Sequence, residues 1–360
     1  MDRRDTPAEP QIAEAGALEW LRDVPALNVI GFSLTGFGDA TSFGKLLEAD
    51  LRQHGWAGVV REISYGGLSI NALAALTPMA AAPVQVGDIV ALELATSFFS
   101  QHKYSLDAAR PLVFAIAEYF VSRGAQRVFF LDLFRADLDD NDCVVQAIRE
   151  ASRYFDLPVL DLKAMFRSLS IDKPVGTTDG VHPDAAARRM IADAIFGLLA
   201  SGPWPVARPK PYAGPLYAYV DLVPRIHGLP RHAYEGRGKS ICAVVAPAGF
   251  HVELELDQSE HVVGFCFLYG PDTGFVEVTV GDHPVQELIT FDENSYYRRI
   301  GFRPLDAHGN RVAVRVLSKV RDMALVRASG IATQGRRDYL CGLIVKRPRS
   351  LTSEWSLESI

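Results

Sequence analysis

Apolar and polar positions follow two different patterns along the chain, and the first pattern covers about two hundred residues. Five apolar runs rich in β-branched residues predict buried strands at 26–32, 58–64, 88–94, 127–132 and 158–162. Apolar positions at helical spacing predict helices at 43–54, from 69 to 76, and at 108–123, 143–155 and 185–199. Strands buried on both faces that alternate with helices indicate an α/β domain, with a parallel sheet between two helical layers.

The second pattern begins after a run of five prolines in residues 202–215, GPWPVARPKPYAGP. Helical spacing then fades, and β-branched and aromatic segments with period two predict strands at 216–222, 250–256, 262–269, 275–280, 311–317 and 339–345. Short strands separated by Gly, Asp and Asn are typical of an antiparallel sandwich. We predict a flexible tail (1–16), an α/β domain (17–202), a Pro-rich linker (203–215) and an all-β sandwich domain (216–350).

Composition and charge exclude several classes of protein. The chain is 48% hydrophobic and 22% charged, which is enough apolar material for a packed core. Its net charge is −6, and no basic excess of the kind that binds nucleic acid is present. No apolar run is long enough for a membrane span, and the N-terminus lacks the apolar region of a secretory signal, so we expect a cytoplasmic protein.

Ser33 stands directly after the first predicted strand, in the segment VIGFSLTGFGD (29–39). Ligand sites in open α/β sheets lie at the carboxyl ends of the strands, where loops and helix N-termini meet. A serine there can present its backbone N–H to a developing oxyanion. A helix cap in an ordinary strand-to-helix turn explains the same residues, so this segment alone leaves both interpretations open.

Asp179 and His182 lie in the segment TDGVHPD (178–184), just before the last predicted helix. A carboxylate at this spacing can fix the tautomer of the imidazole and stabilise the imidazolium that forms when histidine accepts a serine proton. The alternative is a turn followed by a helix cap, which explains Asp-Gly and Pro-Asp but does not require the histidine.

Gly66 and Gly67 follow the second strand, in SYGGLSIN (64–71). A glycine can bring a backbone N–H close to a substrate where a side chain would obstruct it. A plain turn is the simpler explanation of two glycines alone.

Together the three segments resemble the sequence blocks of the SGNH (GDSL-type) serine hydrolase family, in the family's order, over residues 26–200. The resemblance implies a flavodoxin-like three-layer parallel sheet. It also implies Ser33 as nucleophile, Asp179 and His182 as its acid–base partners, and the N–H groups of Ser33 and Gly67 as oxyanion-hole donors. No metal or organic cofactor is required for that chemistry.

Two positions depart from the family pattern. Phe32 stands where the family has an aspartate that orders the loop, and Ser97, in ELATSF (93–98), stands where the family has an oxyanion-hole asparagine. Loss of one such donor costs about 10²–10³-fold in rate. Ser97 itself, Thr96 or Asn71 are the candidate replacements.

Three further groups each leave two interpretations open. His102 is expected at the rim of the site, as a substrate contact or a surface histidine. SYYRRI (295–300) suits carbohydrate or anion binding, or a rim at a domain interface. The third group is an acidic run after the fourth strand. We interpret it as a solvated or helix-capping segment rather than a divalent-metal loop, because the glycine and terminal glutamate of an EF-hand are missing. Its members are Asp132, Asp137, Asp139, Asp140 and Asp142.

The preferred hypothesis is a serine-dependent ester hydrolase or acyl transferase that acts on an acylated small molecule or carbohydrate. The resemblance and the appended β domain favour a carbohydrate O-acetylesterase or an enzyme of polysaccharide acetylation. The alternative is a catalytically degenerate protein of the same fold that binds a glycan or a protein partner, which Phe32 and Ser97 favour. The oligomeric state, a homo-oligomer included, stays open.

Overall fold

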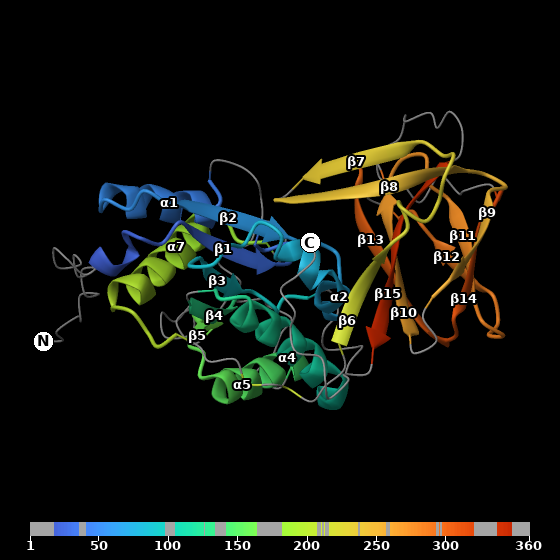
Figure 1. Cartoon of the computed structure of the whole chain (residues 1–360). Helices are drawn as coiled ribbons and strands as arrows, with labels where there is room; N and C mark the ends of the chain where they lie inside the picture. The colour runs from blue at the N-terminus through green and yellow to red at the C-terminus, as the bar shows by residue number, and fades with distance from the viewer. Residues whose placement is uncertain are drawn as a thin grey trace, which may run out of the picture.

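The computed structural model shows an α/β part and a β part that lie side by side (Figure 1). It describes residues 18–35, 41–97, 105–125, 127–133, 142–163, 182–206, 210, 212, 216–236, 238–256, 260–292, 295, 297–319 and 337–347.

The α/β part is built on a five-stranded parallel sheet of order β2-β1-β3-β4-β5. Its strands are β1 (Ala26–Gly31), β2 (Val59–Ser64), β3 (Ile89–Leu92), β4 (Arg127–Asp132) and β5 (Val159–Asp161). This is the flavodoxin-like strand order, as predicted, and ligands in such sheets bind where the order reverses, at the carboxyl ends of β1 and β3. The inner strands β1 and β3 are buried throughout, whereas β2 and β5 are partly exposed because they lie at the edges.

Helices cover both faces of this sheet. A 3₁₀ turn, η1 (Glu19–Leu21), precedes β1, and the helices are α1 (Phe43–Gln53), α2 (Ile70–Ala80), α4 (Leu106–Ser122), α5 (Cys143–Phe155) and α7 (Ala185–Ala200). α1 and α7 share one apolar core with η1, and α2, α4 and α5 share the core on the opposite face. Four of the helices begin at side chains that accept hydrogen bonds from the first turn, as N-caps do: Ser42, Ser105, Asp142 and Asp184.

Among the helices that the structure describes, none has the length and hydropathy that crossing a bilayer would require.

The β part consists of two antiparallel sheets with an apolar core between them. One sheet has the order β13-β10-β15-β8-β7, with β6 paired to β15, and the other has the order β12-β11-β14-β9. The predicted strands correspond to β6 (Leu216–Asp221), β9 (His251–Glu255), β10 (His261–Tyr269), β11 (Phe275–Val280), β14 (Arg311–Val316) and β15 (Arg337–Arg347). Four further strands were not predicted: β7 (Arg231–Gly236), β8 (Lys239–Pro247), β12 (Gln286–Ile289) and β13 (Arg299–His308).

The two parts share one continuous core, and α2 lies at its centre. Eight of the eleven residues of α2 are buried, which is typical of a helix covered on several sides. One side of α2 packs against the α/β part, and another packs against β6 and β15. Ile241, Cys266, Ile300 and Tyr339 of the larger β sheet belong to the same apolar cluster as the α2 residues. The sandwich therefore completes the core of the α/β part.

Candidate active site at the carboxyl ends of β1, β2 and β3

Ser33 lies in a turn that begins where β1 ends. The N–H of Thr35 donates to the carbonyl of Phe32 at 3.2 Å, and this bond closes the turn around Ser33, which is half-buried. Gly31 is required for the close packing here, because a Cβ at this position would lie 2.3 Å from Thr35 Oγ1 and 2.7 Å from the carbonyl oxygen of Glu93. The structure thus places Ser33 at the switch point of the sheet, where a substrate can approach.

Glu93 holds this turn from the neighbouring strand end. Its Oε2 accepts the N–H of Phe32 at 3.1 Å and the hydroxyl of Thr35 at 3.2 Å. Its Oε1 accepts the N–H of Thr96 at 3.1 Å and the hydroxyl of Thr96 at 2.7 Å. Glu93 has no exposed surface, and burial raises its pKa while these four hydrogen bonds oppose the shift.

This carboxylate was missed in the sequence, where the replacement of the family aspartate by Phe32 suggested that the loop had lost its ordering group. The structure shows that Glu93, on the adjacent strand end, orders the loop through the backbone N–H of Phe32. The signal in the sequence was an acidic residue at the end of an otherwise apolar strand, a placement that burial makes costly without several donors nearby.

The end of β2 contacts the same turn. The hydroxyl of Ser64 donates to the Phe32 carbonyl at 2.7 Å, and the N–H of Tyr65 donates to the Gly31 carbonyl at 2.8 Å. The chain then turns, with the Leu68 N–H donating to the Tyr65 carbonyl at 3.1 Å. Gly67 sits in this turn at φ +78°, exposed and with open space where a Cβ would project. A positive φ favours glycine, and the open side leaves room for a substrate beside the backbone.

The side chains of the three other candidate oxyanion donors, Thr96, Asn71 and Ser97, differ in the hydrogen bonds that they already make. Thr96 donates its only hydroxyl proton to Glu93, so that proton is not directed at a substrate. Asn71 accepts hydrogen bonds from Ser69 and Ala72 with its side-chain oxygen at the start of α2. Ser97 is fully buried, and its hydroxyl has no hydrogen-bond partner in the part of the chain that the structure describes. The Asn71 amide group and the Ser97 hydroxyl are therefore the candidates whose protons no hydrogen bond to Glu93 occupies.

His182 lies at the beginning of α7 and is half-buried. Asp184 caps this helix through the N–H of Ala187 at 2.9 Å. Arg188 connects the segment to the chain that follows the Ser33 turn, because its Nε donates to the Pro183 carbonyl at 2.9 Å and its Nη1 donates to the Thr41 hydroxyl at 2.7 Å. The histidine segment is therefore tied to the chain that enters α1.

Two predicted site residues, Asp179 and His102, lie outside the described residues, so the triad stays a prediction. The structure brings the Ser33 turn, the Gly67 turn and the Ser97 segment together on three neighbouring strand ends. It anchors His182 through Arg188 to the segment after Ser33.

Of the five aspartates in the acidic run, the structure describes Asp132 and Asp142. The other three, Asp137, Asp139 and Asp140, lie outside the described residues. Asp142 caps α5 by accepting the N–H groups of Val144 and Val145. Asp132 is buried at the end of β4, and burial raises its pKa to about 6 although Lys163 opposes the shift. Within the described ranges, no group of three or more His, Cys, Asp or Glu residues could hold a metal ion.

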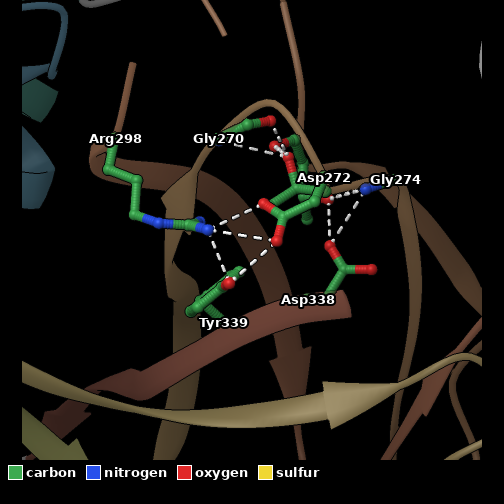
Figure 2. Close-up of polar contacts among 8 residues, drawn as sticks. Gly270, Asp272, Gly274, Arg298, Asp338 and Tyr339 are labelled. Atoms are coloured by element: carbon green, nitrogen blue, oxygen red, sulfur yellow. Dashed lines mark hydrogen bonds and ion pairs between the residues drawn. The ribbon is translucent and has the colours of Figure 1, made fainter. Parts of the chain in front are cut away.

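The arginines of SYYRRI are held by acidic and aromatic partners. Figure 2 shows Arg298 beside Asp272 and Tyr339: its Nη2 donates to both carboxylate oxygens of Asp272, at 2.9 and 3.1 Å, and to the Tyr339 hydroxyl at 2.5 Å. Arg299 pairs with Asp292 and stacks over the ring of Tyr269 at 4.1 Å. Tyr296 lies outside the described residues. Both arginines therefore pair within the sandwich, and each has a buried Nη1 with no hydrogen-bond partner among the described residues.

Comparison with known proteins gives structural similarity alone. No family model matches the chain, and no curated protein matches it. Among solved structures, a two-domain esterase active on acetylated mannans covers 92% of this chain and 94% of its own, with a TM-score of 0.63 and 15% identity. A two-domain esterase of the same description, co-crystallized with mannopentaose, gives a TM-score of 0.62 and 14% identity over 93% of each chain. An acetyl xylan esterase from Geobacillus stearothermophilus covers 50% of this chain and 97% of its own, with a TM-score of 0.43 and 15% identity. The first two similarities extend over both parts of the chain and show its two-domain fold.

Proposed function

We propose that this protein is a serine-dependent carboxylic ester hydrolase that removes acetyl groups from a carbohydrate. The observation that carries the proposal is the Ser33 turn, which three strand ends hold at the switch point of the sheet. The solved structures with the same two-domain fold include an esterase active on acetylated mannans, which supports an acetylated glycan as substrate.

In this proposal the Ser33 hydroxyl attacks the acetyl carbonyl while His182 accepts its proton. The tetrahedral oxyanion receives hydrogen bonds from the N–H groups of Ser33 and Gly67 and from the Ser97 hydroxyl. The protonated His182 then donates to the departing sugar oxygen, and water attacks the acetyl-enzyme with His182 as base. Asp179 would orient the imidazole.

The first test is hydrolysis of p-nitrophenyl acetate by the wild-type protein and by Ser33→Ala. We expect measurable turnover by the wild type and a loss of at least about 10³-fold in Ser33→Ala, which removes the nucleophile. Asp142→Ala, which removes only the N-cap side chain of α5, is the matched control and should keep the wild-type rate. Equal background rates in wild type and Ser33→Ala would reject esterase activity and favour a binding protein on a hydrolase fold.

A further inference from the structure

The tip of a hairpin in the sandwich, β7–β8, lies against the end of β2 (Figure 1). Gly238 at this tip is packed so closely that a Cβ would come within 2.5 Å of the Glu62 carbonyl oxygen. Its φ of +74° also favours glycine. The next residue, Lys239, donates from its ammonium to the Ser64 carbonyl. The sandwich therefore contacts the α/β part at the strand end that leads into the Gly67 turn.

The peptide group between Ser64 and Tyr65 is held from both sides. Its N–H donates to the Gly31 carbonyl of β1 at 2.8 Å. In a trans peptide the C=O points opposite to the N–H, so the Ser64 carbonyl faces away from β1. β2 is an edge strand of the parallel sheet, and an edge strand leaves the carbonyls on its outer side without a strand partner. The Lys239 ammonium supplies the donor for this carbonyl.

Tyr65 connects this peptide group to the Gly67 turn. Its carbonyl accepts the Leu68 N–H at 3.1 Å, which closes a four-residue turn with Gly66 and Gly67 in the middle. The φ of +78° at Gly67 is the value that the third position of a type II turn requires. The Tyr65 ring is 1% exposed, belongs to the core that the sandwich shares with α2, and lies 4.6 Å from the Lys239 ammonium. The sandwich thus holds the first residue of the turn by the preceding peptide group and by the ring.

The two glycines cannot hold the turn by side-chain packing. Glycine loses more backbone freedom on folding than any other residue, and Gly67 is exposed. An oxyanion donor is effective only when its N–H is fixed where the oxyanion forms. A displacement of about 1 Å can cost about 10²-fold in rate. The anchoring of Tyr65 therefore determines how well the Gly67 N–H is placed.

We infer that Lys239 is a positioning residue of the oxyanion hole and that the sandwich is required for the full kcat of the α/β part. The inference rests on the proposed esterase function. By donating to the Ser64 carbonyl and covering the Tyr65 ring, Lys239 holds the Gly67 N–H where it meets the oxyanion. The second domain thereby contributes to the chemical step.

Kinetics on p-nitrophenyl acetate test this role with two substitutions of Lys239. Lys239→Met keeps an apolar stem over Tyr65 but removes the ammonium, so kcat should fall by about tenfold or more. KM should stay within about twofold, because the oxyanion forms only in the transition state. Arginine also donates to carbonyls and stacks on aromatic rings, so Lys239→Arg should keep kcat within about threefold of the wild type. Lys319→Met is the matched control: Lys319 pairs with Glu287 and lies 5.8 Å from the ring of Phe275, in the other sheet, and its loss should leave kcat unchanged.

Hydrogen–deuterium exchange followed by NMR reads the position of the turn independently of activity. The N–H groups of Tyr65 and Leu68 are both hydrogen-bonded, so each exchanges only when the turn opens. We expect both to exchange at least about tenfold faster in Lys239→Met than in the wild type. In Lys319→Met both should exchange at the wild-type rate. Melting temperatures show whether the variants are folded.

The two readouts separate this inference from the proposed function. A wild type without esterase activity, in which Lys239→Met still accelerates exchange at Tyr65 and Leu68, would reject the proposed function and support the anchoring of the turn by Lys239. Wild-type kcat in folded Lys239→Met, an equal loss of kcat in Lys239→Arg, or unchanged exchange at Tyr65 and Leu68 would each overturn the inference and leave the proposed function standing.

Discussion

Replacement of Glu93 by glutamine tests whether this buried carboxylate positions Ser33. Oε1 and Oε2 of Glu93 each accept one backbone N–H, from Thr96 and from Phe32, at 3.1 Å in both cases. A glutamine has one oxygen and one NH₂ group. Whichever way the amide is turned, its NH₂ group faces a backbone N–H, and two donors oppose each other. Glu93→Gln therefore detaches either the Ser33 turn or the Thr96–Ser97 segment.

The size of the effect follows from that conflict. One buried backbone N–H left without an acceptor costs about 1–3 kcal/mol. A catalytic group displaced by about 1 Å can cost about 10²-fold in rate. We therefore expect Glu93→Gln to lower kcat by about 10²-fold with little change in KM, since the residue does not contact the substrate.

The pH dependence of stability gives a second readout. Burial raises the pKa of Glu93 above 4.5 in the folded protein, so the folded state holds its proton more tightly than the unfolded state. The stabilisation that results from this raised pKa is fully present below the pKa of Glu93 in the unfolded state. It is lost as pH rises through the pKa of Glu93 in the folded state. Glutamine does not titrate, so the free energies of unfolding of wild type and variant should differ most below pH 4.5 and converge as pH rises.

Steady-state hydrolysis of p-nitrophenyl acetate and urea unfolding at several pH values measure both effects. Asp142→Ala is the control for destabilisation alone, because loss of the α5 cap, which accepts the N–H groups of Val144 and Val145, costs about 1 kcal/mol. Its kcat should stay at the wild-type value. If Glu93→Gln also kept the wild-type kcat in the folded protein, the assignment of Glu93 as a positioning residue would be wrong.

Three further substitutions test other parts of the site. Ser97→Ala should lower kcat by about 10²-fold or more because an oxyanion donor is lost. Urea unfolding should show no loss of stability, since the deleted hydroxyl has no partner in the described structure; unchanged kcat would exclude Ser97 from the oxyanion hole. Gly31→Ala should destabilise the protein by about 1–3 kcal/mol through overpacking, since its Cβ would overlap Thr35 and Glu93; a wild-type urea midpoint would contradict this packing. Burial raises the pKa of Asp132 from 3.8 to about 6, so the wild type loses stability as pH rises through this interval. Asp132→Asn should therefore be more stable than the wild type by about 3 kcal/mol at pH 8. A smaller difference in the free energy of unfolding at pH 8 than at pH 4 would contradict the direction of the shift.

Hydrophobic pattern predicted the α/β part closely, because each of its strands and helices buries a continuous or periodic set of apolar residues. The strands of the sandwich were harder to predict. The hairpin β7–β8 was missed because β7, RHAYEG, has few large apolar residues, and alternate positions of it are exposed. Gly236 at the end of β7 and Gly238 just before β8 were the available turn signal.

Some residues of the candidate site could likewise be predicted from the sequence, and others could not. Ser33, Gly67 and Ser97 follow predicted strands, so the topology alone brings them to one edge of the sheet. Glu93 and Lys239 could not be assigned from the sequence, because Glu93 acts between two strand ends and Lys239 contacts Ser64 across the two parts of the chain. Local spacing carries no information on such contacts.

The nucleophile can be identified most directly by covalent labelling with a fluorophosphonate, followed by peptide mass mapping. We predict one adduct per chain, on Ser33, with labelling at least about 10²-fold slower in His182→Ala, since the serine then lacks its base. Asp142→Ala should label at the wild-type rate. A folded protein that takes no label, or takes it on a residue other than Ser33, would contradict the assignment of Ser33 as the catalytic serine.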